Sequence, residues 1–243
     1  MTDTTTSTAA PPEPQSLPAR IVGVIFSPRA TYAGVAARPH WFGVLAVVAV
    51  LAGAGAFAFM STDVGQQAWL DAAVRQQEAF GRTLTDEQYT RMQQMANYAP
   101  YFSAVSIVVL PLIATLVSGV FLGVFNAVGG GDASFRQVLA IVSHSTVVLP
   151  LTQLIALPVA YARETLSGVT NLMVFFPFLD ENSFAAHFLG AIDLVYVWWI
   201  VSVSIGLGVL YRRRTGPIAT TLLFVYAAVA LVIAAVRMAL SGA

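Results

Sequence analysis

Cysteine and lysine are both missing from this chain of 243 residues, so all twelve of its basic side chains other than histidine are arginine. The lack of cysteine excludes disulfides, thiolate catalysis and cysteine metal ligands. The lack of lysine excludes Schiff-base chemistry and the lysine that a GxxxxGK[ST] phosphate loop requires. These two absences remove several enzyme classes.

Charge of either sign is also scarce: charged residues make up 10% of the chain, and hydrophobic residues make up 57%. An ordinary soluble domain has about 25% charged residues. Five nearly uncharged stretches reach the length of about 20 apolar residues with which a helix crosses a bilayer. These stretches are residues 41–60, 101–128, 138–162, 184–211 and 217–236. The sequence therefore predicts an all-α integral membrane bundle of five transmembrane helices.

Residues 1–19 are rich in Thr, Ser, Ala and Pro and predict a disordered tail ahead of a membrane domain at 20–243. The tail lacks the basic start and the apolar stretch of a secretory signal. Ser27 and Pro28 then predict an amphipathic N-terminal helix, with Ser27 as its cap and Pro28 in the first helical position. The apolar face of this helix, which includes Tyr32, suits the headgroup layer, although a plain connector to the first span fits equally well.

Residues 61–100 are the one sizeable aqueous segment and predict a helical extramembrane hairpin between the first and second spans. Apolar residues recur at helical spacing up to Phe80, and Thr85 with Gln88 forms a capping box that starts a second helix. The apolar face of the hairpin needs a cover, and both lipid headgroups and a partner protein would serve.

The glycine-rich residues 129–132 predict a flexible turn between antiparallel helices, because neither a lysine nor a preceding strand supports a phosphate-binding loop. Ser134 and Gln137 form a second capping box, which opens the third span. Residues 166–183 are apolar but too short and interrupted to cross, so we expect an interfacial or re-entrant element there.

Arginine placement sets the predicted orientation, because short cytoplasmic segments carry the positive excess. With the N-terminus inside, seven arginines are cytoplasmic and five are outside, three of these in the acidic hairpin. The triplet Arg212, Arg213 and Arg214 in one short turn is the strongest indicator. We expect a cytoplasmic N-terminus and a C-terminus on the outside.

Four polar residues in or near the spans are functional candidates, since an ionisable group at the bilayer centre costs at least about 2.5 kcal/mol. Asp193 is expected near the outer boundary in an ion pair with Arg163, which we favour over a ligand role. His144 is expected near the cytoplasmic side as a hydrogen-bond donor between helices, and His187 lies farther out than Asp193. No catalytic, cofactor-binding or metal-ligating set is predicted.

Small residues spaced four apart predict close helix contacts, because they let backbones approach. The pairs are Gly119 with Gly123, Ala49 with Gly53, Ser202 with Gly206, and Ser204 with Gly208. Packing within the bundle is favoured over self-association for these faces. Prolines at positions 111, 150 and 158 predict kinks, since each releases a backbone hydrogen bond.

Three stretches together resemble a known family: IVGVIFSPRATYAGVAARPHW before the first span, GGGDASFRQVLAIVSHS at the third, and IDLVYVWWIVSVSIGLGVLYRRRT in the fourth. From Arg20 onward, the chain resembles the bacterial branch of the Ypt-interacting protein (Yip) family. The resemblance implies a five-span bundle with a cytoplasmic N-terminus. Eukaryotic members bind Rab-type GTPases, but the DLYGP motif that marks many of them is missing here, so GTPase binding is not implied.

The predicted function is non-enzymatic: a multi-pass protein of the bacterial inner membrane that organises or scaffolds it through lipid or protein contacts. The expected partners are membrane lipids, other membrane proteins or a second copy of the chain. Dispersed arginines argue against nucleic acid, and no cofactor is expected. The alternative is a transporter or channel for a small solute or ion, suggested by Asp193, His144 and the proline kinks. An intramembrane hydrolase would need a nucleophile and a base at one depth, and no such pair is found.

Overall fold

Long apolar helices dominate the computed structural model, which describes residues 15–79, 82–166, 169–180 and 182–241. Among these residues, helices are the regular elements, and one isolated bridge joins Asn171 to Asp193. Four helical stretches are long and apolar enough to cross a membrane: Phe42–Met60, Ala99–Val128, Phe135–Arg163 and Thr215–Leu240. The chain is therefore an all-α, multi-pass membrane protein.

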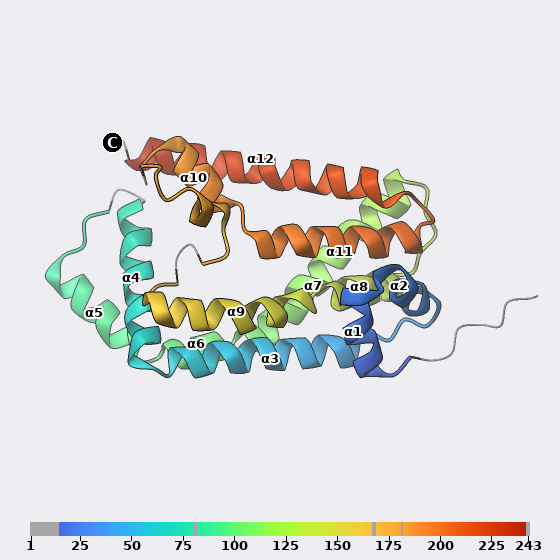
Figure 1. The fold of residues 1–243 in the computed structure, drawn as a ribbon, viewed down its shortest axis with the longest axis horizontal. Helices are drawn as coiled ribbons and strands as arrows, with labels where there is room; N and C mark the ends of the chain where they lie inside the picture. Colours follow the sequence, from blue (N-terminus) through green and yellow to red (C-terminus); the bar gives the residue numbers. More distant parts are fainter. Residues whose placement is uncertain (1–14, 80–81, 167–168, 181, 242–243) are drawn as a thin grey trace, which may run out of the picture.

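The long helices lie side by side as an elongated bundle (Figure 1). Helix α3 is continuous, whereas the next two stretches consist of shorter segments. In chain order the bundle contains α3 (Phe42–Met60), α6 (Ala99–Ala104), α7 (Ser106–Leu122), the π-helical turn η1 (Gly123–Val128), α8 (Phe135–Ser145), α9 (Val148–Arg163), α11 (Leu194–Leu210) and α12 (Thr215–Ser241).

The third stretch is interrupted between α8 and α9, at Thr146 and Val147. Pro150 lies in the first turn of α9 and has no N–H to donate to the Thr146 carbonyl. The interruption of the helix therefore falls where that proline predicts a kink. Pro111 and Pro158 lie inside α7 and α9, and both helices continue through them.

The stretch predicted as one span at 184–211 is two helices, α10 (Phe184–Ala191) and α11, so the expectation of one continuous helix is wrong. Ile192 and Asp193 between them have extended backbones. The Asp193 side chain accepts a hydrogen bond from the N–H of Val195 and thereby starts a new helix. At 1.5 Å per residue, α11 alone is about 25 Å long, slightly less than the hydrocarbon core of about 30 Å.

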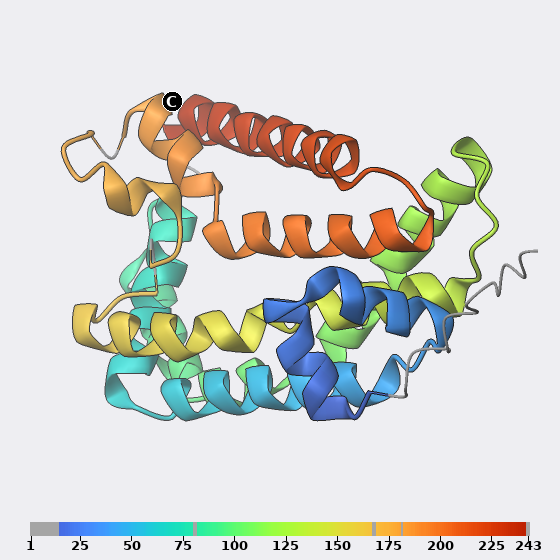
Figure 2. The same cartoon turned by 45° about the vertical axis from the view of Figure 1, so that its right-hand side comes forward.

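Two helices precede the first span, α1 (Leu17–Phe26) and α2 (Pro28–Ala37), and the sequence predicted only the second. Both contact α8, and Figure 2 shows them at the end of the bundle away from α4. Tyr32 and Val35 of α2 are buried in the main core, so this face packs on protein rather than on headgroups. Ser27 precedes α2 but makes no capping hydrogen bond with its side chain, which corrects the predicted cap. Residues 1–14 of the expected tail lie outside the described residues.

The aqueous segment contains α4 (Asp63–Ala79) and α5 (Asp86–Ala96). The capping box of Thr85 and Gln88 at the start of α5 is confirmed, as is the box of Ser134 and Gln137 at the start of α8. Helix α4 crosses the end of the bundle and contacts α3 and α12 (Figure 1). The bundle itself thus covers part of the apolar face of α4, including the fully buried Ala68.

The main core surrounds α8, in which every residue from Val138 to Ser145 is buried. Helices α2, α3, α7 and α11 all pack against it. A hydrophobic run buried on all sides is expected for a central helix of a bundle. The central position of α8 brings α2 and α11 together at one end of the molecule.

Candidate functional site

Asp193 occupies a polar junction where the chain passes from α10 to α11. One carboxylate oxygen accepts from the N–H of Val195 at 2.8 Å, and the other accepts from the Thr170 hydroxyl at 2.6 Å. The Asp193 N–H donates to the Tyr226 hydroxyl on α12 at 2.8 Å. The backbones of Thr170 and Leu194 also bond, at 3.0 Å, as do those of Leu172 and Ile192, at 2.9 Å. The predicted interfacial or re-entrant segment at 166–183 is therefore tied to the helix break.

The predicted ion pair of Asp193 with Arg163 is not formed. Within the described part of the chain the one ion pair is Arg91 with Glu87, on α5. Arg163 is exposed at the end of α9, while hydrogen bonds from a hydroxyl and a backbone N–H satisfy the Asp193 carboxylate. Such bonds stabilise a carboxylate without a cation. Asp193 followed by an apolar run is itself an N-cap signal, and reading it would have located the break.

His144 is fully buried in α8, but it does not link helices as predicted. Its Nδ1 lies 2.7 Å from the carbonyl of Ala140 in the same helix, and its Nε2 has no hydrogen-bond partner. A side chain that bonds back to the carbonyl four residues earlier satisfies itself locally. The expectation of an interhelical bond from His144 is therefore wrong.

The buried interhelical hydrogen bond joins Tyr32 of α2 to Ser202 of α11, with 2.7 Å between the oxygens. Burial raises the pKa of Tyr32, and the Ser202 bond opposes this only in part, so the phenol stays neutral. The partners are 170 positions apart, so no local pattern could reveal them. This bond fixes the N-terminal helices on the bundle.

The four candidate residues do not assemble into one site. His144 and Asp193 lie in different regions, since α8 adjoins the N-terminal helices and Asp193 lies at the far end of α11 (Figure 1). His187 lies on α10, and its Nδ1 is buried without a partner. No group of three metal-ligating side chains was found among the residues that the structure describes.

The predicted small-residue pairs differ in their surroundings. A Cβ at Gly206 would collide with Ile141 and press on the Tyr32 ring, and one at Gly53 would collide with Ile107. Ser204 is buried, and Gly208 lies against Thr215, the first residue of α12. Gly119 and Gly123, in contrast, would meet nothing within 4 Å. Their expected packing inside the bundle is therefore wrong, because this face of α7 and η1 points away from the other described residues.

The turn between α11 and α12 is joined to the loop between η1 and α8. The Tyr211 ring stacks on Phe125 with centroids 4.8 Å apart, and its hydroxyl donates to Asn126 at 2.9 Å. Asn126 in turn donates to the Ala133 carbonyl at 2.8 Å, and Arg213 donates to the Gly129 carbonyl. The glycine-rich loop thus serves as a connection, held by the predicted topology-setting turn.

Similarity to known proteins agrees with the resemblance in the sequence. The Yip1 domain matches residues 22–236 of the chain. Neither the curated proteins nor the solved structures gave a significant match. Because the matched region covers most of the chain, the protein belongs to the Yip1 domain family.

Proposed function

We propose that the protein is a non-enzymatic organiser of the bacterial inner membrane, acting through contacts with lipids and other membrane proteins. The observation that carries this proposal is the structural use of two polar side chains, Asp193 at the helix break and Tyr32 on α2. Asp193 caps α11 and binds Thr170, while Tyr32 binds Ser202 between two helices. Groups committed to such bonds hold a bundle together rather than perform chemistry.

We further propose five crossings, with α11 as the fourth and the N-terminus in the cytoplasm. Helix α11 packs along α12 and on α8, as a crossing helix in a bundle would. Its end carries Arg212, Arg213 and Arg214, which favour the cytoplasmic side. The C-terminus then lies outside.

Reporter fusions test this topology. A periplasmic reporter fused after Ala99 is expected to be active, and a cytoplasmic reporter fused after Arg213 is expected to be active. A cytoplasmic signal after Ala99, or a periplasmic signal after Arg213, would contradict the proposal. The second position also tests α11, because without that crossing the arginine triplet would lie outside.

A transporter is the alternative function, and the structure gives it less support. A cavity of about 410 Å³ lies between α7, α8, α9 and α11. Its lining is mainly apolar and includes Leu110, Ile113 and Trp199, but neither Asp193 nor His144. The decisive assay is flux through liposomes containing the purified protein. A solute flux that Asp193→Asn abolishes would favour a carrier.

A further inference from the structure

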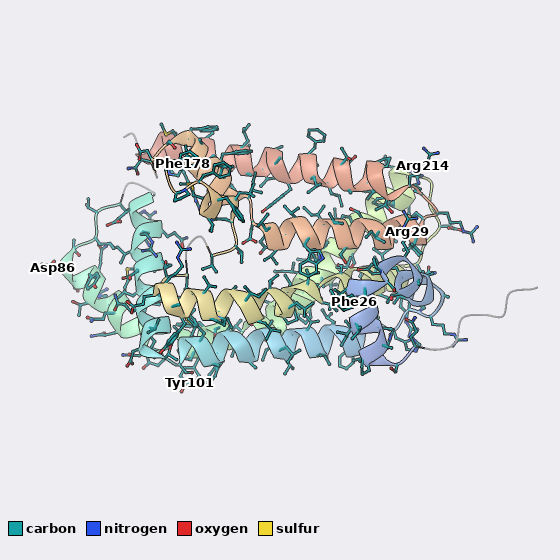
Figure 3. The ribbon with its side chains drawn as sticks, viewed as in Figure 1. Phe26, Arg29, Asp86, Tyr101, Phe178 and Arg214 are labelled. Atoms are coloured by element: carbon teal, nitrogen blue, oxygen red, sulfur yellow. The ribbon has the colours of Figure 1, made fainter. Side chains whose placement is uncertain are left out.

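Four arginines surround one open hollow where α2 meets the turn between α11 and α12. The hollow has a volume of about 610 Å³, and its lining includes Arg29, Arg212, Arg213 and Arg214. Figure 3 shows Arg29 and Arg214 at the same end of the bundle, although they are far apart in the sequence. We call these four residues and the space between them the arginine hollow.

Among the described residues, no carboxylate forms an ion pair with the four arginines of the arginine hollow. The one ion pair among the described residues, Arg91 with Glu87, lies on α5 at the other end of the molecule. The Arg213 side chain donates to the Gly129 carbonyl, and no hydrogen bond or ion pair to the rest of the described chain engages the guanidinium group of Arg29, Arg212 or Arg214. Like charges around one space repel, so a bound anion would stabilise this arrangement.

The backbone at Arg212 supports a functional role for its side chain. Arg212 has φ 53°, in the left-handed region. Its N–H bonds to the Val209 carbonyl, and the next N–H bonds to the Gly208 carbonyl, as in a Schellman motif. Glycine is the favoured residue at this position, because an L side chain is strained there. An arginine at this position, beside three other arginines, is consistent with a use for the guanidinium.

The surroundings of the hollow select a lipid over a soluble anion. The hollow lies where the apolar helix α11 ends and the apolar helix α12 begins, which is the level of the lipid phosphates in the proposed topology. Three residues before Arg29, Phe26 is 81% exposed, and Val22 one helical turn earlier is 56% exposed. Exposed apolar side chains close in the sequence to an arginine suit a segment that contacts acyl chains and phosphates together.

We propose that the arginine hollow binds the phosphate headgroup of an anionic phospholipid of the cytoplasmic leaflet. Guanidinium groups pair with phosphate through parallel hydrogen bonds, and basic pockets between membrane helices suit such headgroups. The amide groups at the start of α12, beginning with Thr215, add a favourable dipole. This inference deepens the proposed function and rests on its placement of this end at the cytoplasmic surface.

Native mass spectrometry of the purified full-length chain in detergent tests the lipid site. The probes are phosphatidylglycerol, cardiolipin, phosphatidylcholine and inorganic phosphate. The variant Arg212→Gly with Arg214→Gln is expected to bind the two anionic lipids at least about tenfold more weakly, with phosphatidylcholine unaffected. Arg212→Lys with Arg214→Lys keeps the charge and is expected to show a smaller loss.

Control variants separate binding from folding. Arg163→Gln removes an exposed arginine at the other end, and Glu164→Gly changes the equivalent backbone position there. Both are expected to bind anionic lipid like the unmodified chain. The site would be overturned if Arg212→Gly with Arg214→Gln bound anionic lipid as tightly as the unmodified chain. It would also be overturned if Arg163→Gln lost as much binding as that double variant. Inorganic phosphate that displaces the lipid at equal concentration would overturn it too, because that result identifies a soluble anion as the ligand.

The lipid-binding experiment and the reporter fusions can fail independently. Binding in detergent does not depend on which side of the membrane the hollow faces. Lipid binding with an inverted reporter pattern would overturn the leaflet assignment and leave the headgroup site. A correct reporter pattern without lipid binding would overturn the headgroup site alone.

Discussion

One helix terminates at each end of the bundle with the same backbone motif, but the key residue of the motif is basic at one end and acidic at the other. Helix α11 ends with Arg212 at φ 53°, and α9 ends with Glu164 at φ 51°. In both cases the next N–H bonds back to a carbonyl five residues earlier, that of Gly208 for Arg213 and that of Ala160 for Thr165. Since the backbone is equivalent, any difference in function between Arg212 and Glu164 must come from the charge and packing around them.

The end at Arg212, which we call the arginine end, combines dense packing with an excess of positive charge. Tyr32 and His144 are fully buried there. Among the described residues, Asp132 is the one acidic residue in its segments. Seven arginines belong to the same segments: Arg20, Arg29, Arg38, Arg136, Arg212, Arg213 and Arg214. Arg20 and Arg136 bond to carbonyls of His40 and Pro39, so part of this charge joins segments together.

The opposite end, formed by α4, α5, α10 and the described residues of 164–183, mixes both signs of charge. It contains the Arg91–Glu87 pair and a small core of Phe59, Ala68 and Ala160. Phe178 is 78% exposed there and is visible near α10 in Figure 3. The comparison teaches that dense burial and an excess of arginine coincide at one end, which suits an anion site.

The largest expected effect tests the dense packing near the arginine end. Gly206→Val places a side chain against Ile141 and Tyr32, so the free energy of unfolding should fall by about 1–3 kcal/mol. The matched control is Gly119→Val, whose new side chain meets nothing within 4 Å. Thermal unfolding in detergent measures both. Equal losses in the two variants would show that α11 is not packed as described.

A smaller effect is expected at the helix break, toward the other end. Asp193→Ala removes the cap of α11 and leaves the Thr170 hydroxyl without its acceptor, so stability should fall by about 1–2 kcal/mol. Asp193→Asn retains an oxygen for the cap and should lose much less. Stability is again measured by unfolding in detergent. If the two variants lose stability equally, the charge of Asp193 matters more than its cap.

The smallest effect distinguishes the two ends at their shared backbone motif. Arg212→Gly and Glu164→Gly both replace a residue in the left-handed region, so each should raise stability by up to about 1 kcal/mol. Only Arg212→Gly should also weaken binding of phosphatidylglycerol. Unfolding and lipid binding are measured on the same preparations. A loss of lipid binding in Glu164→Gly would remove the contrast between the ends.

Local patterns in the sequence predicted much of the fold. The apolar runs located the long helices, and both capping boxes formed because their partners are only three residues apart. The break at Asp193 was missed because an apolar run on both sides outweighed a single capping residue. Helix α1 was also missed, since its first residues continue a polar, proline-containing segment.

The candidate sites depend on distant contacts, which no local pattern contains. Ser202 meets Tyr32 only after α2 packs on α11. Arg29 joins Arg212 and Arg214 for the same reason, although the triplet itself stood out in the sequence as a topology signal. His144 could be placed near one end, but its bond to Ala140 required the helix geometry.

Thiol labelling tests most directly the central claim that the two ends face different sides of a membrane. Because the natural chain lacks cysteine, Ala30→Cys on α2 and Gln94→Cys on α5 each introduce one exposed thiol. In intact spheroplasts, a membrane-impermeant maleimide is expected to label Gln94→Cys at once and Ala30→Cys only after permeabilisation. Labelling of Ala30→Cys in intact spheroplasts, with Gln94→Cys protected, would contradict the account.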